Sequence, residues 1–100
     1  MRKKAISKEL VLKDARNAPR LVEIQRKVRE KTIAMLVAKR KAKKMTQSDI
    51  ALITGIQRPN ISRLESGNYN PTIDMLVRIA DSMGLKVNIT FSEKKIHMNN

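Results

Sequence analysis

The side chains of this sequence that could do chemistry are mostly cations. The chain has 22 Lys and Arg against 9 Asp and Glu, a net charge of +13, with one histidine and no cysteine. Cations at this density favour phosphate and other anions as ligands. His97 stands in a polar stretch, the three glycines form no phosphate-cradling loop, and no Ser/His/Asp or Cys/His set can be assembled. We therefore expect no enzyme activity, no metal site and no cofactor.

The positive charge is concentrated at the N-terminal end. Residues 1–44 hold 16 basic and 4 acidic side chains, which is +12, whereas residues 45–85 hold 3 and 4, which is −1. Residues 86–100 add 3 basic and 1 acidic side chain, which is +2. Such asymmetry is typical of an arm or helix face that attracts phosphate or an anionic partner protein.

Composition also narrows the class of partner. Tyr69 and Phe91 are the only aromatic residues, so the base-stacking platforms of single-strand and RNA-binding modules are poorly supplied, and duplex DNA is the better prediction. The longest apolar run, Ile33 to Ala38, is far short of the ~20 residues of a membrane helix. The basic start lacks the apolar segment of a secretory signal. We expect a cytoplasmic protein without membrane contact.

The N-terminal half predicts a tail followed by one long helix. Residues 1–18 show weak periodicity and are interpreted as a basic tail. After Pro19, which suits a first helical turn, apolar residues recur at helical spacing, and Lys and Arg crowd the last turn. The pattern predicts a basic helix over residues 20–43.

The sharpest local signal is the start of a second helix at Thr46. Its hydroxyl can cap the helix while Asp49, three residues later, can accept from the Thr46 amide. The helix runs to residue 54 and is stopped by Gly55, which adopts a left-handed conformation without a Cβ clash.

A further helix over residues 57–66 follows almost at once. Gln57 is a candidate cap and Pro59 lies in the first turn, where its missing amide is harmless. Ile61 and Leu64 supply a buried stripe. Two short helices joined by a glycine turn predict a helix-turn-helix over residues 46–66.

The C-terminal part predicts one more helix and then a strand. Thr72 caps a helix that ends at Gly84 and closes a helical domain over residues 19–85. The alternation of Val87, Ile89 and Phe91 with polar residues predicts a single β-strand over 86–92. Residues 93–100 are polar and are interpreted as a flexible tail.

Over residues 33–85 the sequence resembles the Cro/C1-type helix-turn-helix family of phage and bacterial repressors, also called the XRE family. The residues that carry the resemblance are Arg40, Met45-Thr46-Gln47, Ile50-Ala51, Gly55, Ile61-Ser62, Glu65, Gly67, Pro71, Leu76, Ile79-Ala80 and Gly84. The resemblance implies an all-α, lambda-repressor-like helix-turn-helix bundle, here with a long N-terminal basic helix and one C-terminal β-strand.

The resemblance also implies roles for individual residues. Arg40 and Glu65 match the family's partly buried salt bridge. The helix over 57–66 matches the recognition helix, which enters the major groove of DNA with its N-terminal residues against base edges. The implied DNA-binding residues are Gln57, Arg58, Asn60 and Arg63 for bases, Gln47 for a phosphate, and Ser62 and Asn68 as further contacts. An Arg side chain can donate two hydrogen bonds to guanine, and the Gln and Asn amides can form two hydrogen bonds with adenine.

The sequence therefore predicts a sequence-specific repressor that binds a pseudo-palindromic DNA operator as a homodimer. The dimer is expected because the lone C-terminal strand needs a partner strand from a second copy. The alternative is an antitoxin of the HigA and HipB type that neutralises a toxin protein and represses its own operon. Many messenger-cleaving toxins are themselves basic, and the +12 segment would repel them.

Overall fold

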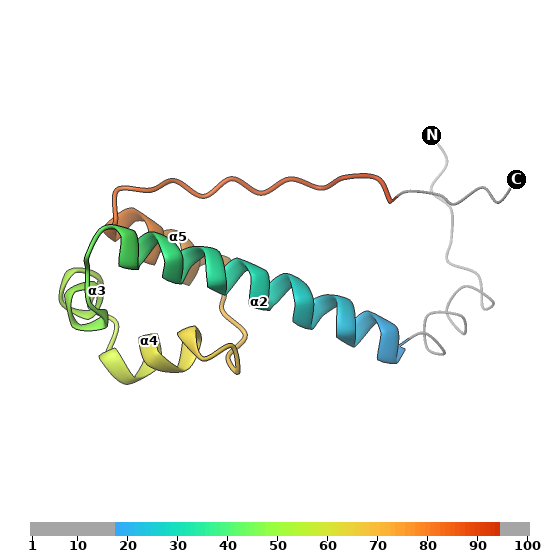
Figure 1. The fold of residues 1–100 in the computed structure, drawn as a ribbon, viewed down its shortest axis with the longest axis horizontal. Helices are drawn as coiled ribbons and strands as arrows, with labels where there is room; N and C mark the ends of the chain where they lie inside the picture. The colour runs from blue at the N-terminus through green and yellow to red at the C-terminus, as the bar shows by residue number, and fades with distance from the viewer. Residues whose placement is uncertain (1–17, 95–100) are drawn as a thin grey trace, which may run out of the picture.

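Across residues 18–94, the part of the chain that the computed structural model describes, the fold consists of four helices (Figure 1). They are α2 (Ala18–Ala42), α3 (Gln47–Thr54), α4 (Arg58–Glu65) and α5 (Ile73–Ser82). The prediction of an all-α helix-turn-helix bundle is confirmed, with helix boundaries close to those expected. The long α2 extends well past the three short helices, which gather at its C-terminal end.

The end of α2 is set by Lys44 rather than by a glycine. Lys44 has a φ of 57°, in the left-handed region. This turn lets the Lys44 amide donate to the Lys41 carbonyl at 2.9 Å and the Met45 amide donate to the Arg40 carbonyl at 3.1 Å. Left-handed backbone normally favours glycine, so this position is strained.

The start of α3 is the predicted capping box. The Asp49 amide donates to the Thr46 hydroxyl at 2.9 Å, and the Thr46 amide donates to the Asp49 carboxylate at 2.8 Å. The helix ends at Gly55, which has a φ of 79° and donates its amide to the Ala51 carbonyl. No atom lies within 4 Å of where a Cβ would stand at Gly55, so the turn itself, rather than crowding, requires glycine.

The start of α4, unlike that of α3, has no side-chain cap. Gln57 stands at the cap position with an extended backbone, but its side chain makes no capping hydrogen bond. Pro59 lies in the first turn, where the helix has no use for its missing amide. The Gln57 side chain therefore remains exposed to solvent.

One small core joins the four helices. It consists of Ile33, Ile50, Ile61, Leu64, Ile79 and Met83, all almost fully buried. Ile61 and Leu64 occupy the buried positions that the sequence predicted for the second helix of the pair. Only the C-terminal half of α2 contributes to this core, because Leu21, Ile24 and Val28 are exposed.

The predicted C-terminal strand over 86–92 is wrong for the described chain. Residues 85–94 follow an extended path (Figure 1), but no β-strand occurs anywhere in residues 18–94. A strand is defined by backbone pairing, and this segment has no neighbouring strand to pair with. It runs back along α2 instead (Figure 1), with Val87 half-buried and Phe91 96% exposed.

The predicted tails fall mainly on residues that the structure does not describe. Residues 1–17 and 95–100, with His97 among them, lie outside the described range. Within residues 18–94, no helix is both long enough and apolar enough to cross a membrane.

Candidate nucleic-acid interface

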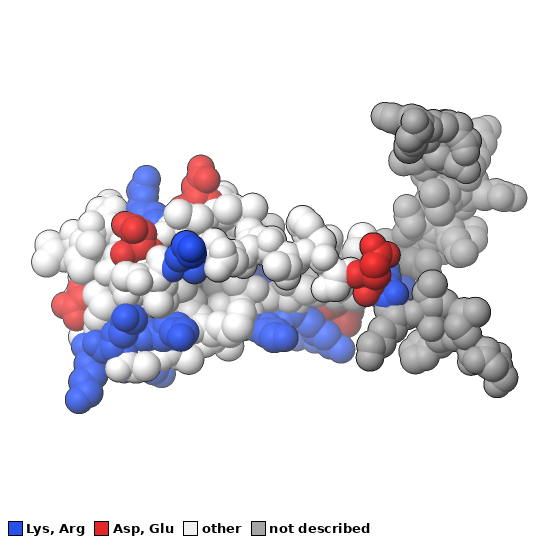
Figure 2. Space-filling view, turned by 90° about the horizontal axis from the view of Figure 1, so that it is seen from above, with Lys and Arg blue, Asp and Glu red and all other residues white. Residues whose placement is uncertain are grey.

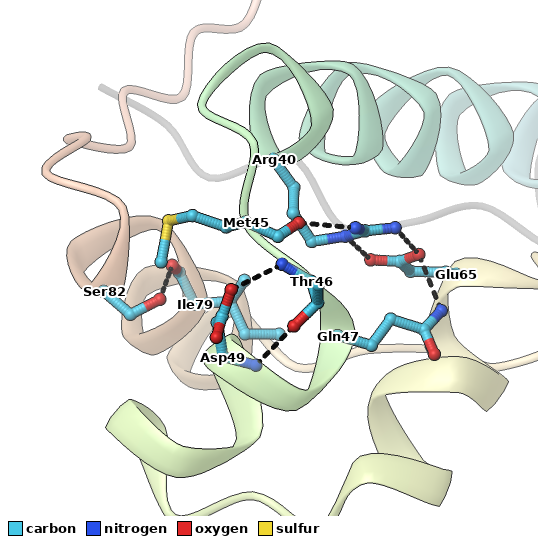
Figure 3. A network of polar contacts seen from close by, with 8 residues as sticks. All are labelled: Arg40, Met45, Thr46, Gln47, Asp49, Glu65, Ile79 and Ser82. Carbon is cyan, nitrogen blue, oxygen red and sulfur yellow. Dashed lines mark hydrogen bonds and ion pairs between the residues drawn. The ribbon is translucent and has the colours of Figure 1, made fainter.

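An ion pair between α2 and α4 organises the site. The Arg40 guanidinium donates from Nε to Glu65 Oε2 and from Nη2 to Glu65 Oε1, both at 2.7 Å (Figure 3). Both side chains are nearly buried, with exposed fractions of 11% and 12%. Two parallel charge-assisted bonds fix the guanidinium in one orientation, so the pair holds the end of α4 against α2.

The same guanidinium also fixes the entry into α3. Its third nitrogen, Nη1, donates to the Met45 carbonyl at 2.8 Å. Met45 immediately precedes the Thr46 cap, so the bond places the start of α3 relative to α2 and α4 (Figure 3).

Gln47 joins the network from the first turn of α3. Its Nε2 donates to Glu65 Oε1 at 3.0 Å, so the residue expected to hold a phosphate is bonded to a carboxylate within the protein. An amide nitrogen has two hydrogens, and the second remains a possible donor to phosphate.

The Glu65 carboxylate has a lowered pKa. Its burial by itself raises the pKa, but the hydrogen bonds donated by Arg40 and Gln47 favour the ionised form and bring the pKa below its ordinary value. The carboxylate is therefore charged near neutral pH and keeps both partners bound.

The outer face of α4 carries one predicted base contact, Arg63, and one of the further predicted contacts, Ser62. Ile61 and Leu64 point into the core, so the opposite face, at helical spacing, presents Pro59, Ser62 and Arg63. All three are exposed. The structure thus places Ser62 and Arg63 together on one accessible surface.

The other predicted contacts lie at the two ends of α4. Gln57 and Arg58 are exposed at its start, and Asn60 is half-buried beside them. Asn68 follows the other end, where its amide donates to the Ser66 hydroxyl at 3.3 Å and its side chain is exposed. The structure therefore separates Asn68 from the three residues at the start of the helix.

A basic hollow of about 450 Å³ lies where α2, α3 and α4 meet. Its lining consists of Arg40, Lys41, Lys44, Met45, Thr46, Gln47, Ser48 and Arg58. The start of α3 opens into it, and helix N-termini favour anions through their free amides and dipole. The hollow therefore suits an oxyanion such as a phosphate group.

Lys41, Lys44 and Ser48 were missed as site residues by the sequence reasoning. One signal in the sequence could have identified Lys44. It stands two residues before the Thr46 cap, and this position places a cation beside the first turn of α3. Within residues 18–94 there is no group of three or more His, Cys, Asp or Glu side chains that could hold a metal ion.

Comparison with known proteins points to the same part of the chain. Residues 36–89 match a family model described as helix-turn-helix. The chain is also similar to a protein named as an uncharacterized HTH-type transcriptional regulator from Methanocaldococcus jannaschii. The two are 34% identical over 47 residues, which are 47% of this chain and 71% of that relative. No solved structure matches the chain.

Proposed function

The chain belongs to the Cro/C1-type helix-turn-helix family of DNA-binding transcriptional regulators, and we propose that it represses transcription by occupying a pseudo-palindromic operator. The observation that carries this proposal is the exposed polar face of α4 beside the basic hollow at the start of α3. Bases and phosphates can then be contacted from one side of the molecule.

Base recognition is assigned to α4. The major groove is about 12 Å wide and admits an α-helix. With the Ile61 side of α4 held in the core, Arg63 and Arg58 extend toward the groove, where each guanidinium can donate two hydrogen bonds to guanine. Gln57 and Asn60 are assigned to adenine by the same reasoning.

Phosphate binding is assigned to the basic hollow. Lys41, Lys44 and Arg58 supply charge, and the first turn of α3 supplies amide donors. A phosphate held there fixes the protein on the DNA backbone and sets the depth at which α4 enters the groove.

We further propose that the regulator acts as a homodimer. Residues 85–94 follow an extended path (Figure 1), and Ile89 and Phe91 are 53% and 96% exposed. Pairing with the same segment of a second copy would satisfy the free backbone groups and cover these side chains. A two-fold axis would then place two copies of α4 about 34 Å apart, one turn of DNA.

The dimer is tested by ending the chain after Gly84. We expect the truncated protein to sediment as a monomer and to bind half-sites weakly. A full-length protein that sediments as a monomer at micromolar concentration, both free and on DNA, would rule the dimer out.

DNA reading is tested by selecting binding duplexes from a randomised pool with the full-length protein. The expected product is an inverted repeat whose half-sites are about one helical turn apart. A selection that enriches no sequence would contradict the proposal.

The antitoxin alternative makes a separate prediction. A neighbouring gene should then encode a toxin whose expression arrests growth and whose effect this chain relieves when both are expressed. The absence of such a gene favours a regulator alone.

A further inference from the structure

A stripe of apolar side chains runs along α2 on the side away from α4. It consists of Leu21, Ile24, Val28 and Met35, which are between 38% and 60% exposed. The intervals of three, four and seven residues follow a heptad repeat, the spacing by which one helix packs along another. We call these four residues the α2 stripe.

Two hollows lie beside the stripe. The first, of about 480 Å³, has a lining that includes Ile24, Val28, Arg29, Thr32 and Leu76. The second, of about 140 Å³, has a lining that includes Thr32, Met35, Lys39, Leu76, Lys86 and Val87. Both include Thr32 and Leu76, so the two hollows are neighbours along α2, and we call them together the α2 groove.

The charges around the α2 groove have one sign. Arg29, Lys39 and Lys86 belong to its lining, and none of its lining residues is acidic. Lys31 interrupts the α2 stripe between Val28 and Met35. Figure 2, which looks onto the side that carries residues 85–94, shows a largely uncharged area with many of the visible Lys and Arg along one edge and a few Asp and Glu scattered elsewhere on this side.

The acidic residues of α2 lie away from the groove. Glu23 and Glu30 both bind Arg26, at 2.6 Å and 2.9 Å. Glu30 also lines a separate hollow between α2 and the end of α4. They therefore do not neutralise the cations of the groove.

We propose that the α2 groove binds an amphipathic helix of a partner protein whose apolar residues are flanked by Asp and Glu. The heptad spacing suits a helix, and the stripe from Leu21 to Met35 spans about 21 Å, or roughly four helical turns. Apolar contacts would bury the stripe, while the flanking carboxylates would pair with Lys31, Lys39 and Lys86.

Charge decides between this partner and a second copy. Two stripes packed together would bring Lys31 and Lys39 of each copy close to the same cations of the other, and like charges oppose docking. Residues 1–17 of the chain are also an unsuitable occupant by charge, with six basic and two acidic side chains. DNA bound through α4 would lie away from the groove, because the hollow between α2 and the end of α4 shares no lining residue with it.

The test uses the full-length protein without DNA, so it is independent of the proposed repressor function. The probes are two helical peptides of about 20 residues with Leu at the a and d heptad positions. One carries Glu and the other Lys at the flanking positions. We expect the Glu peptide to bind at least tenfold more tightly and to shift backbone amide resonances of α2, α5 and residues 85–87, with α4 unaffected.

Charge reversal supplies the decisive variant. Lys31→Glu combined with Lys39→Glu should make the protein prefer the Lys peptide. The matched control, Lys43→Glu with Arg78→Glu, makes the same change in net charge outside the groove and should keep the original preference. Thermal unfolding shows whether both variants fold.

Three results would overturn the proposal. The first is equal binding of the two peptides, or binding of neither. The second is a dimer that dissociates on Val28→Glu, which would identify a second copy in the groove. The third is a shift of the groove's amide resonances on addition of anionic phospholipid vesicles but not of the Glu peptide. That result would identify a membrane surface as the ligand of the groove.

Discussion

Arg40 and Glu65, which are 25 positions apart in the sequence, form a two-pronged ion pair with both N–O distances at 2.7 Å. The pair joins the end of α2 to the end of α4, and Gln47 adds α3 to it. Three of the four described helices are thus held by one carboxylate. The orientation of α4, on which base recognition depends, follows from this contact.

Removing the Glu65 charge should destabilise the fold. In Glu65→Gln the nearly buried Arg40 loses its counterion, and we expect the free energy of unfolding to fall by about 3 kcal/mol. Urea unfolding measures it. The control is Glu23→Gln, which removes an exposed partner of Arg26 and should cause no measurable change. Equal effects of the two substitutions would show that the Arg40–Glu65 pair is not structural.

Stability should also fall in acid because of Glu65. Its folded-state pKa lies below its ordinary value of 4.5, so the ion pair contributes fully above about pH 4.5. That contribution is lost as the pH falls through the folded-state pKa. The melting temperature, measured from pH 7 to pH 3, should drop more steeply for the native protein than for Glu65→Gln. Parallel curves would assign the acid sensitivity to other carboxylates.

Replacing Lys44 with Gly should raise the stability of the protein but weaken its binding to DNA. Its φ of 57° strains any residue with a Cβ, so Lys44→Gly should stabilise the protein by about 1 kcal/mol despite greater freedom of the unfolded chain. The same change removes a cation from the basic hollow and should weaken binding to every duplex. Lys44→Gln, which removes the charge but keeps a strained Cβ in the left-handed turn, separates the two effects. Unchanged DNA affinity in both variants would exclude Lys44 as a phosphate contact.

The N-terminal charge should appear in the salt dependence of DNA binding. Deleting residues 1–17 removes six basic and two acidic side chains and leaves α2 intact. If those cations contact phosphates, the slope of log affinity against log salt should become shallower by roughly 0.9 for each lost contact. An identical slope would place this charge away from DNA.

The helices were predictable from the sequence because capping residues and glycines mark their ends locally. The ion pair was predictable because Arg40 and Glu65 match a specific family pattern. Thr46 and Asp49 form a capping box whose spacing is itself the signal, and Gly55 marks a backbone conformation that few other residues adopt. The absence of a C-terminal strand in the described residues was not predictable in the same way. Alternation of Val87 and Ile89 tells which side chains share a face, but not whether another backbone lies within hydrogen-bonding distance.

The basic hollow was only partly predictable. Gln47 and Arg58 were identified in the sequence, whereas Lys41 and Ser48 join them only because three helices meet at one point. The left-handed turn at Lys44 that makes this meeting possible carries no glycine to mark it. The exposed α2 stripe was likewise hidden, because helical spacing alone does not distinguish a core face from a surface one.

The central claim is that α4 reads base sequence, and equilibrium binding of three alanine variants to the selected operator and to a scrambled duplex tests it most directly. Arg58→Ala and Arg63→Ala should each weaken operator binding by about 1–3 kcal/mol and relax base choice at one position, with little change on the scrambled duplex. Gln47→Ala should weaken binding to both duplexes alike. Equal losses on the two duplexes for all three variants would contradict base reading by α4.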